Sequence, residues 1–121
     1  MDILLLLWMF TVKHFLVDFV FQTAEEVEHK GTYLDYRGVK HSIKHAFGTL
    51  FVLLILGASF EQSWMYAAAD FVIHYHIDWA KMNLNTYWQL HPLHHAKFWW
   101  LMGADQWAHQ MTYLLLTLLV F

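Results

Sequence analysis

Four long stretches of the chain are dominated by apolar residues, and short polar segments separate them. The stretches cover about residues 3–22, 39–60, 64–82 and 98–120. Each approaches the roughly 20 residues that a helix needs to cross the hydrocarbon core of a membrane. None offers the charged outer face that a helix of a soluble bundle presents to water. The pattern predicts a single all-α domain over residues 1–121, an integral membrane four-helix bundle.

The connections between the stretches are short. Residues 23–38 form the first connection, in which Glu26 and its acidic neighbours are expected to lie in a solvated helix end. A tight turn is expected at Glu61–Ser63, and residues 83–97 form the third connection. The N-terminus has no basic segment before its first apolar run and no small-residue cleavage pattern, so we expect no cleavable signal peptide.

Charge predicts the orientation and the environment. Outside the apolar stretches, basic residues lie only at the first and third connections. The positive-inside rule therefore places these connections in the cytoplasm and both termini outside it, in a bacterial inner membrane. With 59% hydrophobic and 14% charged residues and a net charge of −3, the expected partner is the lipid bilayer and not a nucleic acid. Glycines at 48, 57 and 103 are expected to allow close packing, either between copies in a homo-oligomer or within one chain. Another membrane protein is a further candidate partner.

Ionisable residues interrupt the apolar stretches, and they are spaced by three or four positions. This spacing puts them on one face of each helix. At a rise of about 1.5 Å per residue, the four sets lie at similar depths near the cytoplasmic side. Because buried charges turn away from lipid and toward one another, we expect one polar His/Asp centre in the cytoplasmic leaflet. Its members are His14, Asp18, His41, His45, His74, Asp78, Asp105 and His109.

This set of side chains is suited to binding one or two divalent metal ions. Imidazole and carboxylate ligands together favour Zn, Mn or Fe. The three aspartates, Asp18, Asp78 and Asp105, are also the candidates for general-base catalysis, and some could orient a ligating imidazole. Two alternatives remain open at this stage: a proton or ion relay, and hydrogen bonds that only hold the helices together.

Other ionisable residues have weaker assignments. Lys13 is expected to find a buried partner, whereas Lys81 is either a counter-ion to Asp78 or an interface residue. The histidines at 91, 94 and 95 lie in the third connection, where solvation is expected more than metal binding.

The joint pattern resembles a family of small bacterial and phage membrane proteins, domain of unknown function 3307. The resemblance rests on His14-x3-Asp18-x3-Gln22, His41-x3-His45, His74-x3-Asp78-x2-Lys81 and Asp105-Gln106-x2-His109, in this order. It implies an integral inner-membrane protein with a polar His/Asp centre, and it implies no established activity. There is a looser similarity to membrane-bound metal-dependent hydrolases.

The sequence therefore favours a membrane-embedded metalloprotein, with hydrolysis of lipid-like or amphiphilic substrates as the leading function. The alternatives are a proton- or ion-conducting transport component and a phage or bacterial accessory protein that binds another membrane protein. Three of the stretches are almost wholly apolar in the half away from the histidines, at residues 3–10, 50–56 and 114–121. This favours a pocket that opens to one side over a conduit through the membrane.

Overall fold

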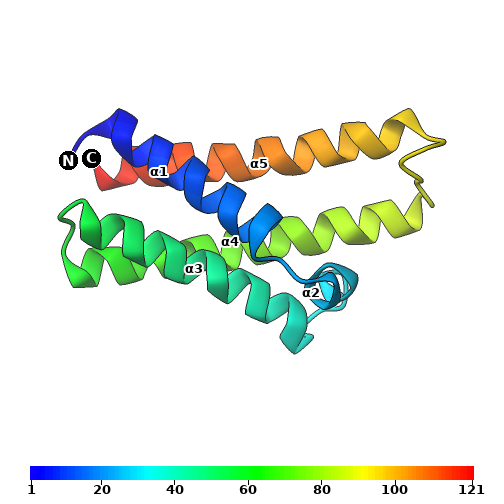
Figure 1. The fold of residues 1–121 in the computed structure, drawn as a ribbon, viewed down its shortest axis with the longest axis horizontal. Coiled ribbons are helices and arrows are strands. Elements are labelled where there is room, and N and C mark those ends of the chain that lie inside the picture. Colours follow the sequence, from blue (N-terminus) through cyan, green and yellow to red (C-terminus); the bar gives the residue numbers. More distant parts are fainter.

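The computed structural model describes all 121 residues, and its regular structure is entirely helical. The α-helices are α1 (Ile3–Phe15), α2 (Ala24–His29), α3 (Tyr36–Ile55), α4 (Phe60–Tyr87) and α5 (Ala96–Val120), with a π-helical turn, η1 (Leu16–Val20), after α1. α3, α4 and α5 run alternately up and down, and α1 lies across α3 and α5 (Figure 1). The expected all-α class is confirmed. Both termini lie at one end of the molecule, and the α4–α5 connection lies at the other (Figure 1).

Polar side chains fix where the helices begin. Asp2, Thr23, Asp35 and Ser59 each precede a helix and accept a hydrogen bond from a backbone N–H of its first turn. Such caps satisfy N–H groups that have no partner within the helix.

The turn between α3 and α4 corrects one expectation. Gly57 has a φ of 91°, a left-handed conformation that glycine adopts without strain, and it ends α3. The backbone N–H of Ala58 then donates to the carbonyl of Leu53 at 3.0 Å, as in a glycine-terminated helix. With Ser59 capping α4, the tight turn predicted at Glu61–Ser63 was wrong, because these residues already lie in the first turn of α4.

The other two connections also differ from the expected ones. The first contains a separate helix, α2, which packs on α3. α4 continues to Tyr87, well beyond the expected end at residue 82, and so shortens the third connection. Gln89, with a φ of 50°, follows the end of α4, and the backbone N–H of Leu90 donates to the carbonyl of Asn85 at 3.1 Å.

Polar side chains outnumber apolar ones in the interior. Sixteen polar or charged residues are buried, against nine hydrophobic ones. Large apolar side chains such as Leu4, Phe51 and Trp100 point outward and are 77%, 63% and 68% exposed. By length and apolar composition, one segment, Ile3–Val20, could cross a membrane. α3, α4 and α5 are long enough, but their ionisable residues lower their hydropathy.

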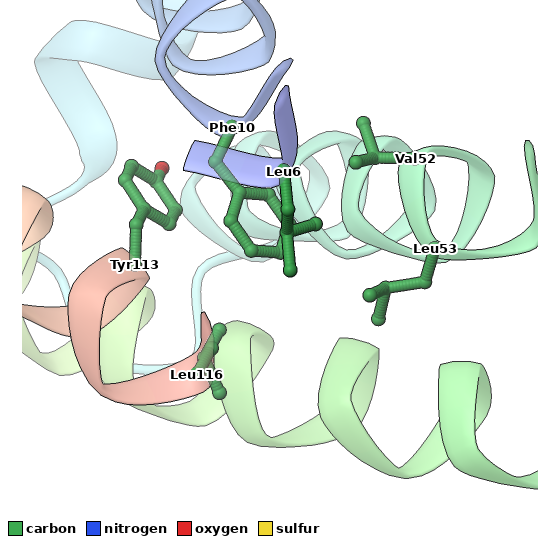
Figure 2. Close-up of a cluster of buried hydrophobic side chains, with 6 residues drawn as sticks. All are labelled: Leu6, Phe10, Val52, Leu53, Tyr113 and Leu116. Atoms are coloured by element: carbon green, nitrogen blue, oxygen red, sulfur yellow. The ribbon is translucent and has the colours of Figure 1, made fainter. Parts of the chain in front are cut away.

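The apolar core lies toward the end of the molecule that carries the termini. It comprises Leu6, Phe10, Val52, Leu53, Tyr113 and Leu116 (Figure 2). The rings of Phe10 and Tyr113 stack with centroids 5.4 Å apart. Phe10 precedes His14 by one helical turn, so this core adjoins the polar side chains of α1 and covers them on the side of the termini.

Candidate metal centre

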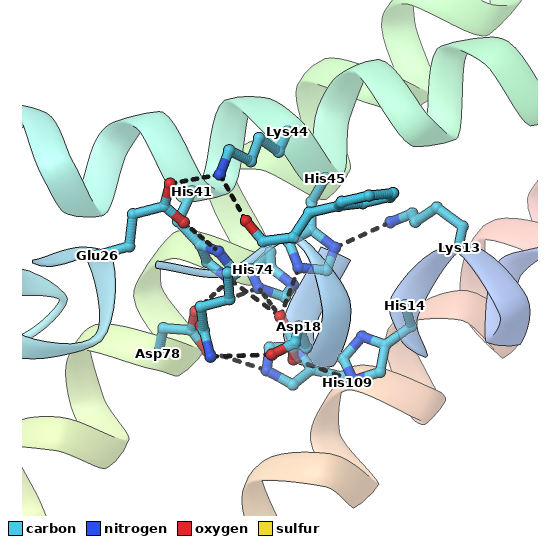
Figure 3. Close-up of polar contacts among 12 residues, drawn as sticks. Lys13, His14, Asp18, Glu26, His41, Lys44, His45, His74, Asp78 and His109 are labelled. Atoms are coloured by element: carbon cyan, nitrogen blue, oxygen red, sulfur yellow. Dashed lines mark hydrogen bonds and ion pairs between the residues drawn. The ribbon is translucent and has the colours of Figure 1, made fainter. Parts of the chain in front are cut away.

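The five histidines and three aspartates predicted from the sequence meet in one buried cluster (Figure 3). They come from α1, η1, α3, α4 and α5, so every long segment contributes. Two groups have ligand atoms within 4.8 Å of one another: Asp18, His41, His45 and His74, and then His74, Asp78 and His109. His14 joins through Asp18 at 3.2 Å, and Asp105 joins through His109 at 3.3 Å. The structure therefore contains buried His/Asp groups that could hold a metal ion.

Asp18 is the carboxylate on which the first group converges. Its Oδ1 lies 2.7 Å from Nε2 of His45 and 2.9 Å from Nε2 of His41. It belongs to η1, where the backbone N–H of Phe21 donates to the carbonyl of Leu16 at 2.8 Å, one residue further than in an α-helix. Wide turns of this kind are frequent at functional sites. Nothing in the sequence analysis predicted the wide turn.

Asp78 is the carboxylate of the second group. Its Oδ2 lies 3.2 Å from Nε2 of His74, and its Oδ1 lies 3.1 Å from Nε2 of His109. The lysine that pairs with it is Lys30, with Nζ at 3.3 Å from Oδ2. The structure thus gives the role of counter-ion to Lys30 and not to Lys81.

Polar groups at the periphery of the cluster contact the Nδ1 atoms of three histidines. Nδ1 of His41 lies 3.3 Å from the Glu26 carboxylate, and Nδ1 of His45 lies 3.3 Å from Nζ of Lys13. Nδ1 of His14 lies 2.9 Å from the hydroxyl of Tyr113. Metal-ligating histidines usually have such a partner, which fixes the ring and turns its other nitrogen toward the ion.

Glu26 was expected in a solvated helix end, and this was wrong. α2 packs on α3, which leaves Glu26 only 1% exposed and brings its carboxylate to Lys44 and His41. Burial alone would raise the pKa of Glu26, but the hydrogen bond and the charge of Lys44 outweigh it and hold that pKa below its ordinary value. The sequence did contain a signal for the start of α2, because Thr23-x-x-Glu26 has the spacing of a capped helix N-terminus.

Several buried atoms of the centre have no hydrogen-bond partner. They are Nε2 of His41, both ring nitrogens of His74, Oδ2 of Asp78 and Oδ1 of Asp105. Atoms that bind one ion at about 2.1 Å in a tetrahedron lie about 3.4 Å apart. Oδ2 of Asp78 is 3.2 Å from Nε2 of His74 and 3.5 Å from Nε2 of His41. The free atoms and their spacing therefore fit a small divalent cation.

The charges in and around the centre do not balance. Five carboxylates face three ammonium groups, which leaves two negative charges in excess while the histidines are neutral. The carboxylates are those of Asp18, Glu26, Asp70, Asp78 and Asp105, and the ammonium groups are those of Lys13, Lys30 and Lys44. Buried charges are paired or coordinate metals, and one divalent cation would balance this excess.

Protonation of several histidines is an unfavourable way to balance the excess negative charge, because the rings lie close together. The ring of His74 stacks between those of His45 and His109, with centroid distances of 3.6 and 4.1 Å. Like charges so close in a buried site repel strongly. Adjacent rings in this stack are therefore not charged together, and neutral rings are the form that ligates metals.

Lys13 has the buried partner that the sequence predicted, namely Asp70, with Nζ and Oδ2 2.8 Å apart. Asp70 was not among the predicted metal ligands, and it lies at the edge of the centre. The histidines of the third connection, at 91, 94 and 95, are exposed and remote from the centre.

Comparison with known proteins gives a family and no activity. No curated protein and no solved structure matches the chain. The match to a family model, DUF3307, described as a protein of unknown function, covers residues 5–121 and therefore includes all eight residues of the centre. The resemblance seen in the sequence is thus confirmed. The chain belongs to the DUF3307 family.

Proposed function

We propose that this chain is an integral protein of a bacterial inner membrane, with α1, α3, α4 and α5 embedded in lipid. The support is the distribution of side chains, with polar groups inside and large apolar groups outside. In water a protein with such a surface would aggregate, whereas in a bilayer its apolar side chains contact the apolar lipid chains. The histidines and aspartates point into the bundle, where ionisable residues within membranes are normally found.

The centre binds at least one divalent cation, either Zn, Mn or Fe. The observation that carries this proposal is the excess of two negative charges in a buried cluster of ligand atoms, several of which have no hydrogen-bond partner. His74 belongs to both ligand groups, so one ion could use either group or two ions could share the site. Asp18 and Asp78 lie within these groups and are the proposed carboxylate ligands.

The proposed reaction is hydrolysis of an ester or phosphoester in an amphiphilic substrate. A divalent cation held there would lower the pKa of a bound water molecule. Asp105 lies outside both ligand groups, with its Oδ1 3.3 Å from Nε2 of His109, and it is the proposed general base. It accepts a proton from the water as the water oxygen attacks the substrate and the bond to the leaving oxygen breaks, and the proton then passes to that leaving oxygen. At 7% and 6% exposure, Asp105 and Asp18 are the least buried carboxylates of the centre.

The apolar core supports a pocket over a conduit. Leu6, Phe10 and Leu116 fill the space between the centre and the termini, with almost no exposed surface. A proton or ion path through the bundle would have to cross this core, which offers few polar groups.

Metal content is the test of the centre. The wild-type chain is purified in detergent without chelator, after growth with zinc, manganese and iron, and its metals are measured by mass spectrometry. We expect a stoichiometric divalent ion in the wild type and its loss in His74→Ala, because His74 belongs to both ligand groups. His94→Ala, in the exposed third connection, is the matched control and should keep its metal. A wild type that carries no divalent ion would overturn the proposal.

Hydrolysis is tested separately, on the metal-loaded chain. Mixed micelles containing ester and phosphoester lipids are incubated with the wild type and with Asp105→Asn. Because Asp105 is proposed as base and not as ligand, Asp105→Asn should keep its metal and lose about 100-fold or more in rate. Metal without hydrolysis of any substrate in the panel would leave a binding protein and refute the enzyme.

A further inference from the structure

The hydrogen bonds of Lys13 determine which histidines of the centre carry their hydrogen on Nε2, the ring nitrogen that faces the middle of the cluster. Its ammonium group lies 2.8 Å from Oδ2 of Asp70, 3.3 Å from the hydroxyl of Tyr113 and 3.3 Å from Nδ1 of His45. A lysine ammonium has three hydrogen atoms to donate and no lone pair to accept with. Its three neighbours must therefore all act as acceptors.

This fixes the form of His45. Because Nδ1 accepts from Lys13, it is the nitrogen without a hydrogen, and the neutral ring carries its hydrogen on Nε2. That nitrogen lies 2.7 Å from Oδ1 of Asp18, a group that can only accept. His45 thus donates to Asp18, and it has no lone pair there for a metal ion.

His14 reaches the same state by another path. Nε2 of Gln106 donates to the Asp105 carboxylate at 3.1 Å, so the amide oxygen of Gln106 faces Nε2 of His14 at 2.9 Å. That ring nitrogen must then carry the hydrogen. Nδ1 of His14 accepts from the hydroxyl of Tyr113 at 2.9 Å, and the oxygen of this hydroxyl accepts from Lys13.

His41 has the opposite arrangement. Both of its nitrogens face carboxylate oxygens, Nδ1 that of Glu26 at 3.3 Å and Nε2 that of Asp18 at 2.9 Å, so with a cation at Nε2 the hydrogen lies on Nδ1. The lone pair of Nε2 then points at Oδ1 of Asp18 at 2.9 Å and Oδ2 of Asp78 at 3.5 Å. A lone pair between two carboxylate oxygens is stable only with a cation among them.

We propose that the five histidines divide into two classes, and that Lys13 sets the form of His14 and His45. His14, His45 and His109 are positioning residues, whose Nε2 atoms donate to Gln106, Asp18 and Asp78. His41 and His74 supply the nitrogen ligands, together with Asp18 and Asp78. This division deepens the proposed metal function and rests on it for the word ligand, but the hydrogen placement in His14 and His45 holds with or without a bound ion.

The hydrogen placement is measured by NMR on the full chain in lipid nanodiscs, with nitrogen-15 in the histidines and with chelator present. Two-bond nitrogen–proton correlations distinguish a ring that carries its hydrogen on Nδ1 from one that carries it on Nε2. We expect Nε2–H for His14 and His45 under these conditions, and Nδ1–H for His41 once Zn²⁺ is bound. Lys13→Met should abolish the single form of His45, while leaving His41 unchanged. An Nδ1–H form of His45 in the wild type would overturn the inference, whether or not the chain binds metal.

The ligand division is measured by titration with Zn²⁺. His41→Gln and His45→Gln are a matched pair on α3, since both side chains are fully buried and both contact Oδ1 of Asp18. Glutamine keeps a donor for Asp18 but replaces the imidazole lone pair. We expect His45→Gln to weaken Zn²⁺ binding by about 10–100-fold at most, and His41→Gln to weaken it beyond that range. Equal losses in the two variants would contradict the division, whereas a wild type that binds no Zn²⁺ would refute the metal proposal and leave the NMR result to stand alone.

Discussion

Lys13 and Asp70 form an ion pair inside the bundle, with Nζ and Oδ2 2.8 Å apart and side-chain exposures of only 4% and 1%. Thr49 donates to the same oxygen of Asp70 at 2.6 Å. Through His45 and Tyr113, Lys13 also contacts α3 and α5. The ion pair therefore joins all four long helices at the boundary between the apolar core and the metal centre.

Removal of one partner of this ion pair should be far more damaging than removal of both. Lys13→Met or Asp70→Leu leaves a buried charge without a partner, which typically costs about 3–5 kcal/mol. The double variant removes both charges, and we expect it to be clearly more stable than the sum of the single losses predicts. Unfolding in mixed detergent, followed by circular dichroism, measures all three. Strictly additive losses would show that the two side chains do not interact.

Gly48 should not tolerate a side chain. A Cβ at this position would lie 2.6 Å from Cγ of Lys13, near the middle of a side chain held at its far end by Asp70. We expect Gly48→Ala to lower the melting temperature, although alanine favours helix formation.

Gly103 provides the control for that substitution, because nothing lies within 4 Å of a Cβ built there. Gly103→Ala should therefore raise stability by up to about 1 kcal/mol through helix propensity alone.

The same open position is where a second copy of the chain could approach. If Gly103→Ala instead lowered the mass of the particle in nanodiscs, it would support the predicted self-association.

Acid should weaken the start of α3. The Asp35 carboxylate accepts from Nε and Nη2 of Arg37 at 2.9 and 2.8 Å and from its backbone N–H at 3.0 Å. The hydrogen bond from Arg37 is the main reason that the pKa of Asp35 lies well below its ordinary value. A carboxyl with a lowered pKa stabilises the fold above its ordinary pKa, and this contribution is lost as the pH falls toward the lowered value.

We therefore expect Asp35→Asn to lower the melting temperature at pH 7 and to have progressively less effect below about pH 4. Melting curves across this range, with wild type and variant in the same detergent, provide the comparison. A difference that stays constant with pH would contradict the assignment to this carboxylate.

Sidedness can be measured with single cysteines, since the chain contains none. Leu93, 82% exposed, marks the α4–α5 connection, and Glu61, also exposed, marks the opposite end of α4. A membrane-impermeant maleimide added to intact cells should label Glu61→Cys and leave Leu93→Cys unlabelled. Both should react after lysis. Labelling of Leu93→Cys from outside would reverse the predicted orientation.

The sequence predicted the centre well because two regularities act together. Spacing by three or four positions puts His41 with His45, and His74 with Asp78, on single helix faces. Helices of alternating direction then bring residues of equal depth to one level. These rules depend only on helix geometry and on the cost of leaving charges in apolar surroundings, so they did not require knowledge of the packing.

Groups that reach the centre from outside the long helices were not predictable in this way. Glu26 and Lys30 lie in and after α2, and only the packing of that short helix on α3 brings them inward. The end of α3 at Gly57 and the cap at Ser59 were both present as residue types, but the apolar pattern ran across them and hid the turn. Local patterning thus gave the faces of the helices and left out the tertiary contacts.

The wide turn Leu16–Val20 sets two requirements against each other, namely the stability of the helix and the position of Asp18. If Val17 were deleted, the backbone could return to an ordinary α-helix with better-aligned hydrogen bonds, but Asp18 would follow His14 by three residues in place of four and would lie on another part of the helix face. Asp18 would then turn away from His41 and His45. Selection for stability alone would favour the shortened chain. The extra residue is therefore kept only while the position of the Asp18 carboxylate matters more than the stability of its helix.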